Sequence, residues 1–125
     1  MGKRFVESLD QLLELRMNVR SLPEGAEYED ERTQGLLKLM QFVKRINRDA
    51  TYIRYVHQLA DSHVKANNMT EAAFTLCLHA DLLTWSNQEL PADYGFPAQT
   101  MSARKEALTL RIIDHMEKVF FFFSP

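Results

Sequence analysis

The chain has 125 residues, of which 46% are hydrophobic and 26% charged, a composition that is ordinary for one folded domain and argues against disorder along most of its length. Its 15 Lys and Arg residues against 17 Asp and Glu residues give a net charge of -2, so the chain has no overall positive charge that would attract nucleic acid or an anionic membrane. The single cysteine and the lack of a long apolar run exclude an internal disulfide and favour a cytoplasmic protein without membrane insertion.

Two amphipathic helices are expected in the first part of the chain. Apolar residues from Phe5 to Met17 recur at spacings of three and four, which predicts a first helix, and Pro23 with Gly25 ends it. The acidic run at 27–31 favours the start of the next helix over a cation site, because acid complements the positive end of the helix dipole. This second helix is expected to end near residue 47 and to face inward with Leu36, Leu39, Met40, Val43 and Ile46, broadened by Leu37 and Phe42.

The middle of the chain is predicted to form a helical hairpin. Asp49 can cap the start of a third helix, whose inner face carries Tyr52, Tyr55, Val56, Leu59, Ala60, His63 and Val64. A turn at 67–70 leads to a fourth helix over 71–85, with Thr70 placed as its cap. Ala72 and Ala73 in that helix are small enough to let another backbone approach closely, as paired helices of solenoid repeats do.

The last third is predicted to be a loop followed by a fifth helix. Residues 86–99 contain two Pro and one Gly and are expected to be irregular. The helix is expected from Thr100 to near Lys118. The β-prone run 120–123 would have no partner as a strand, so no strand is expected. The predicted fold class is therefore all-α, with about five antiparallel helices in a TPR-like, α-solenoid array.

The sequence offers no clear catalytic or ligand-binding constellation. No pair among its four histidines has the i, i+4 spacing of a helical zinc site, so each is expected to have a structural role. Cys77 lies two residues from His79, on a different helical face and among apolar neighbours that favour an inert thiol, so a hydrolase built on the two is the least supported alternative. No glycine spacing fits a phosphate loop. We expect no catalytic, metal-binding or cofactor-binding residue, and no cofactor.

Two runs of sequence carry a resemblance to a known family. Residues 47–61 read Asn-Arg-Asp-Ala-Thr-Tyr-Ile-Arg-Tyr-Val-His-Gln-Leu-Ala-Asp, and residues 68–85 read Asn-Met-Thr-Glu-Ala-Ala-Phe-Thr-Leu-Cys-Leu-His-Ala-Asp-Leu-Leu-Thr-Trp. Both resemble the first lobe of the exchange domain of the DOCK family, called DOCKER or DOCK homology region 2. Residues 112–118 also look like the next helix of that lobe.

The resemblance implies a fragment of a guanine-nucleotide exchange factor that activates a Rho-family GTPase, Rac or Cdc42, by releasing GDP. In this family the two later lobes hold the GTPase, whereas the first lobe is a helical-repeat array that braces the second lobe and often mediates homodimerisation. No residue here matches the family's catalytic loop. The resemblance thus implies a scaffold or dimerising segment that is not itself an enzyme. The alternative is an independent helical-repeat adaptor that binds a peptide or protein partner.

The resemblance also divides the chain. Residues 1–118 are expected to be a partial first lobe. The family usually continues with Gly and then a Trp-Glu pair, whereas residues 119–125 read Val-Phe-Phe-Phe-Phe-Ser-Pro. Consecutive Phe residues would leave an exposed apolar tail, so this segment is expected to be a truncated or aberrant end.

Overall fold

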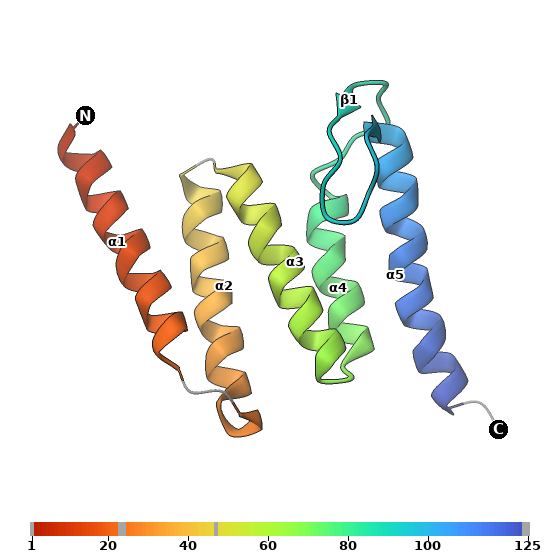
Figure 1. Ribbon diagram of the computed structural model, residues 1–125, viewed down its shortest axis with the longest axis horizontal. Coiled ribbons are helices and arrows are strands. Elements are labelled where there is room, and N and C mark those ends of the chain that lie inside the picture. The colour runs from red at the N-terminus through yellow and green to blue at the C-terminus, as the bar shows by residue number, and fades with distance from the viewer. Residues whose placement is uncertain (1, 23–24, 47, 124–125) are drawn as a thin grey trace. The chain divides into compact units, whose positions relative to one another are not determined.

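The computed structural model describes residues 2–22, 25–46 and 48–123, and within them the chain forms five α-helices and one small sheet (Figure 1). The all-α fold class is confirmed, while the antiparallel repeat arrangement stays a prediction. No described helix is both long enough and apolar enough to cross a bilayer. The elements in chain order are α1 (Gly2–Ser21), the 3-10 turn η1 (Ala26–Tyr28), α2 (Glu29–Arg45), α3 (Asp49–Lys65), α4 (Met69–Ala80), β1 (Glu89–Leu90), β2 (Gln99–Thr100) and α5 (Met101–Phe123).

The chain divides into two compact units, one up to Tyr55 and one from Val56 onward, and each is described by itself. In the first unit α1 packs against α2. The two helices come closest at Gly35, where a Cβ atom would lie 2.8 Å from Cγ2 of Val19. A side chain at this position would force one of the helices to shift, so Gly35 permits the close packing.

The inner face predicted for α2 is confirmed for four of its five residues, since Leu36, Leu39, Met40 and Val43 are buried and Ile46 is half-buried. The acidic run also begins α2 as expected, with Glu29 in its first turn. The four buried residues lie on one side of the helix, as their spacing of three and four requires.

The apolar stripe predicted for the first helix is wrong in part. Leu13 and Met17 are exposed, whereas Leu15 and Val19 are half-buried. The physical reason is that α1 approaches α2 through Val19, at the glycine, and this turns the predicted stripe away from the contact. The side chains of Phe5 and Leu9 lie outside the described residues.

In the second unit α4 packs against α5 around one apolar cluster. Ala72 and Ala73 are buried, which agrees with close helix packing. The cluster is formed by Ala60, Leu76, Ala80, Leu83, Phe96 and Leu108.

The predicted end of the fourth helix, at residue 85, is wrong, because α4 ends at Ala80. Two backbone groups beyond this point bind side chains of α5 instead of continuing the helix. Lys105 Nζ donates to the carbonyl of Leu83 at 2.8 Å, and the amide of Thr84 donates to Sδ of Met101 at 3.2 Å. The helix also begins earlier than expected, with Asn68 at the cap position and Thr70 inside the first turn.

The expectation of no strand is also wrong. Within the predicted loop β1 pairs with β2 in antiparallel register, Glu89 opposite Thr100 and Leu90 opposite Gln99. At the tip, Asp93 and Phe96 exchange two backbone hydrogen bonds of 3.0 and 2.8 Å. Strands of two residues are too short to show a periodicity of two in a sequence.

Helix α5 begins where it was expected and ends later. The hydroxyl of Thr100 accepts a hydrogen bond from the amide of Ala103 at 3.1 Å, which caps the first turn. The helix then continues to Phe123, beyond the predicted end near Lys118, because no Gly or Pro interrupts it before Pro125. Residues 119–123 are thus helical, and the assignment of 119–125 as an aberrant end stays a prediction.

The close packing at Gly35 can be tested with a double-mutant cycle. Gly35→Ala should destabilise the chain by about 1 kcal/mol despite the better helix propensity of Ala, because its methyl group meets Val19. In a Val19→Ala background the same change should become neutral or stabilising, as followed by urea unfolding. Equal effects of Gly35→Ala in both backgrounds would contradict the proposed contact.

Candidate functional site

The most distinctive polar cluster of the described residues lies in the second unit, where α3, α4 and the loop meet. Nε2 of His57 on α3 and Nδ1 of His79 on α4 are 2.8 Å apart and share a hydrogen bond. The two residues are only 9% and 2% exposed. Because a neutral imidazole has one donor and one acceptor nitrogen, the bond requires one ring to donate and the other to accept. The structural role expected for each histidine did not include this pairing.

Tyr94 at the tip of the loop covers the histidine pair. Its ring stacks on His57 with 4.5 Å between centroids and 9° between planes, and it meets His79 edge-on at 6.0 Å. Tyr94 has a φ of 52°, a left-handed conformation that is uncommon for a bulky side chain. Oδ1 of Asp93 accepts a hydrogen bond from the Tyr94 amide at 2.9 Å and helps to hold this turn.

Burial keeps both histidines neutral near pH 7. It lowers the pKa of His57 from 6.5 to about 4, with the positive charge of Arg111 acting in the same direction and Asp93 opposing it. Burial likewise lowers the pKa of His79 to about 4, assisted by His57 and Arg104. The neutral state is the one that the shared hydrogen bond needs.

A buried arginine fastens the loop to α5. Arg104 is only 4% exposed, and its Nη2 donates to the carbonyls of Pro91 at 2.7 Å and Pro97 at 3.0 Å. Its Nε donates to Oε1 of Gln99 at 3.2 Å. These acceptors compensate the cost of burying the guanidinium, which would otherwise be several kcal/mol.

Aromatic contacts and the loop ends add to this attachment. The guanidinium groups of Arg104 and Arg111 lie 5.5 and 4.2 Å from the centre of the buried Phe96 ring. Lys105, whose Nζ binds the Leu83 carbonyl, also lies 5.2 Å from the ring centre of the exposed Trp85. Residues of α5 therefore hold the loop at its start, its tip and its end.

The remaining candidate groups show no activated chemistry. Burial, and then the negative charge of Asp81, raises the pKa of the Cys77 thiol, which agrees with the inert thiol expected from its neighbours. His63 lies 3.7 Å from a carboxylate oxygen of Glu71. Within the described residues, no group of three or more His, Cys, Asp and Glu could hold a metal ion. The expectation that the chain has no catalytic, metal or cofactor site stays a prediction.

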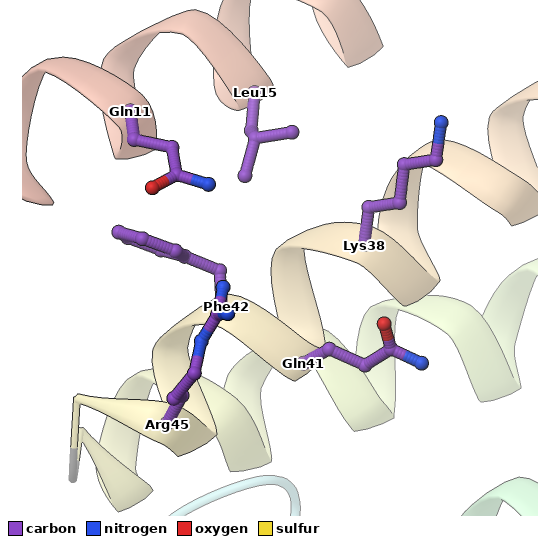
Figure 2. A pocket seen from close by; sticks show the side chains of 6 residues that line it. All are labelled: Gln11, Leu15, Lys38, Gln41, Phe42 and Arg45. Atoms are coloured by element: carbon purple, nitrogen blue, oxygen red, sulfur yellow. The ribbon is translucent and has the colours of Figure 1, made fainter.

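In the first unit, α1 and α2 leave an opening of about 310 Å³ between them (Figure 2). Its lining consists of Gln11, Leu15, Lys38, Gln41, Phe42 and Arg45. Ligand sites in proteins have polar groups that converge on the ligand. The cluster under the loop is the better candidate site, because its polar groups are buried and bonded to one another.

A second feature of the second unit is an apolar stripe on the exposed side of α5. Leu110, Ile113 and Phe120 are 59%, 46% and 75% exposed. Their spacing of three and seven residues places them on one helical face, together with the exposed Glu106 and Glu117. Exposed apolar groups that line up in this way are typical of protein–protein contacts.

Comparisons with known proteins point to one family over most of the chain. Residues 36–117, which include the histidine pair, the loop and its arginines, match the family model described as DHR-2, Lobe A. Dedicator of cytokinesis protein 3 from Mus musculus is 41% identical over 118 residues, which cover 94% of this chain and 6% of that protein. Dedicator of cytokinesis protein 4 from Homo sapiens is 36% identical over the same shares. The chain thus spans about 6% of the length of these curated relatives.

The attachment by Arg104 can be tested by substitution. Arg104→Ala removes three hydrogen bonds and leaves two loop carbonyls without this donor, so we expect the free energy of unfolding to fall by about 3 kcal/mol. The Arg104→Lys variant should have a free energy of unfolding between those of wild type and Arg104→Ala, because an ammonium group lacks the planar set of N–H donors of a guanidinium. Unfolding in urea, followed by Trp85 fluorescence, measures both. The exposed Arg48→Ala serves as control and should change stability by less than about 0.5 kcal/mol; a similar value for Arg104→Ala would contradict the attachment.

Proposed function

Because the chain belongs to the DOCK family, as the lobe A segment of its DHR-2 domain, we propose that it is the scaffold portion of a guanine-nucleotide exchange factor for a Rho-family GTPase such as Rac or Cdc42. In this proposal the later lobes of the family's domain bind the GTPase and release GDP. The chain itself braces them in the cytoplasm and takes no part in the chemistry.

One observation carries the proposed bracing role. The histidine pair and Arg104 are buried polar groups that hold the second unit together. The histidines bind each other, and Arg104 binds three acceptors of the loop. Buried polar groups that bind one another in this way stiffen the packing of a unit. Among the described side chains, the buried Nδ1 of His115 on α5 has no hydrogen-bond partner.

The stripe on α5 supports a second part of the proposal, which is pairing with another copy of the chain. A two-fold dimer uses the same patch on both subunits, so the patch must be complementary to itself. If two α5 helices cross in opposite directions at Ile113, each Glu106 lies opposite Phe120 of the other copy rather than opposite a carboxylate. The apolar centre then meets itself without repulsion between like charges.

The alternative of an independent adaptor would use the opening between α1 and α2 to bind a peptide (Figure 2). The match of residues 36–117 to the DHR-2 lobe A model favours the exchange-factor scaffold over this alternative. Capture of a defined peptide by the chain, without any self-association in sedimentation, would support the adaptor instead.

The lack of exchange activity in the chain alone can be measured directly. Mixed with Rac loaded with fluorescent GDP, the chain should leave the rate of GDP release unchanged, because the proposal assigns release to the later lobes. A complete DHR-2 domain of a relative serves as positive control in the same assay. Acceleration of about tenfold or more by this chain would overturn the proposal, since it would correspond to about 1.4 kcal/mol of transition-state stabilisation.

Pairing through α5 can be tested with charge substitutions. The wild-type chain should dimerise at concentrations on the order of 50 µM in sedimentation velocity, which corresponds to about 6 kcal/mol of association free energy. Leu110→Glu with Ile113→Glu should make it monomeric, because carboxylates would then meet at the centre of the interface. Met17→Glu on α1, a change at another exposed apolar residue, should have no effect. A dimer that survives the double substitution would exclude this face.

A further inference from the structure

The hydrogen bond between His57 and His79 depends on protonation. At 2.8 Å, Nε2 and Nδ1 can share one proton, but two protonated rings would place one N–H group against the other. A single added proton creates an imidazolium that is almost without access to water, because the two residues are 9% and 2% exposed. A charge in such a position is costly unless it is hydrated or paired.

The surrounding charges add to this cost. From α5, Arg111 acts on His57 and Arg104 acts on His79, and both arginines disfavour an added positive charge. From the loop, Asp93 acts on both histidines and favours it. From α3 and α4 the facing titratable groups are the two histidines themselves. The two guanidinium groups outweigh the one carboxylate, so the surrounding charges disfavour protonation of the histidines.

A single turn of the loop covers the pair. Tyr94 lies over His57 at the tip of a turn, and its φ of 52° is a conformation that its neighbours must hold in place. Water can reach an imidazolium on α3 or α4 only if this turn moves away. Arg104 binds the loop at Pro91, Pro97 and Gln99, on both sides of the tip, so the turn at Tyr94 can move while these hydrogen bonds to α5 remain.

We propose that the histidine pair and Tyr94 form a proton-sensitive latch, which on acidification releases the tip of the loop from α3 and α4 while the helices remain folded. Tyr94 packs against the apolar cluster of the unit, so its release would uncover part of that cluster. Acidification would then expose apolar side chains on this unit, and such a surface favours association with other proteins. This inference is independent of GTPase activation.

The direction follows from the pKa values of the two histidines. In the closed loop both lie at about 4, and after release they return toward the ordinary value of 6.5. The released state therefore binds more protons, so closure is fully favoured above pH 6.5 and is lost as the pH falls toward 4. At pH 5 one histidine that recovers its ordinary pKa shifts the equilibrium about 30-fold toward release.

Hydrogen exchange of the full chain measures the release. Between pH 7.5 and pH 5, corrected for the intrinsic pH dependence of exchange, protection of the tip amides of Asp93 and Phe96 should fall by about tenfold or more. Protection in α4 and in the middle of α5 should persist, and helical circular dichroism should be unchanged. Unchanged protection of the loop, or loss of protection in α4 and α5 together with the loop, would overturn the latch.

Variants connect the pH dependence to the pair. His57→Phe with His79→Leu keeps a ring beneath Tyr94 but removes both titrating groups, so protection of the loop should be the same at both pH values. His63→Gln, a change at a half-buried histidine of α3 outside the pair, should retain the wild-type pH dependence. If the double variant does not fold, histidine NMR of the wild type decides. Titration of His57 and His79 near pH 6.5 with the loop still protected would overturn the proposal.

Discussion

The burial of Arg104 is the constraint on which the second unit depends. A guanidinium cannot lose its protein acceptors in a buried position without a large penalty, so the segment 91–99 has to return to α5 and present carbonyl and amide oxygens to it. That return brings Phe96 between two arginines and Tyr94 over the histidines. The hydrogen bonds to the Arg104 guanidinium therefore order the loop, and its own short sheet contributes little to that order.

Sequence patterns located most of the helices because each is specified locally. The inner face of α2 follows a spacing of three and four, and α3 begins near the expected place, although Asp49 lies in its first turn rather than at the cap position. The errors arose where another element decides the outcome. α4 ends at Ala80 because α5 takes up the next backbone groups, and α1 turns its face because Gly35 lets Val19 approach. Neither effect leaves a trace in the local periodicity.

The histidine pair shows the same limit at the candidate site. His57 and His79 are 22 positions apart and meet only after two helices have packed, so spacing rules for helical metal sites could not relate them. One signal was available, since His79 follows Leu76 by three residues and Ala72 by seven and thus lies on the buried face of α4. The family resemblance covered both histidines but did not give their contact. Assignment to a family identified a role for the whole segment and left the roles of single residues to geometry.

The order of these groups along the chain has a consequence during protein synthesis. His57 and His79 are made before Tyr94, Arg104 and Arg111, which later cover them and lower their affinity for protons. At a ribosomal rate of roughly 5–20 residues per second, the nascent chain carries both helices for seconds without their cover. During that interval the apolar face of α4 lacks α5, the helix against which it packs in the folded unit.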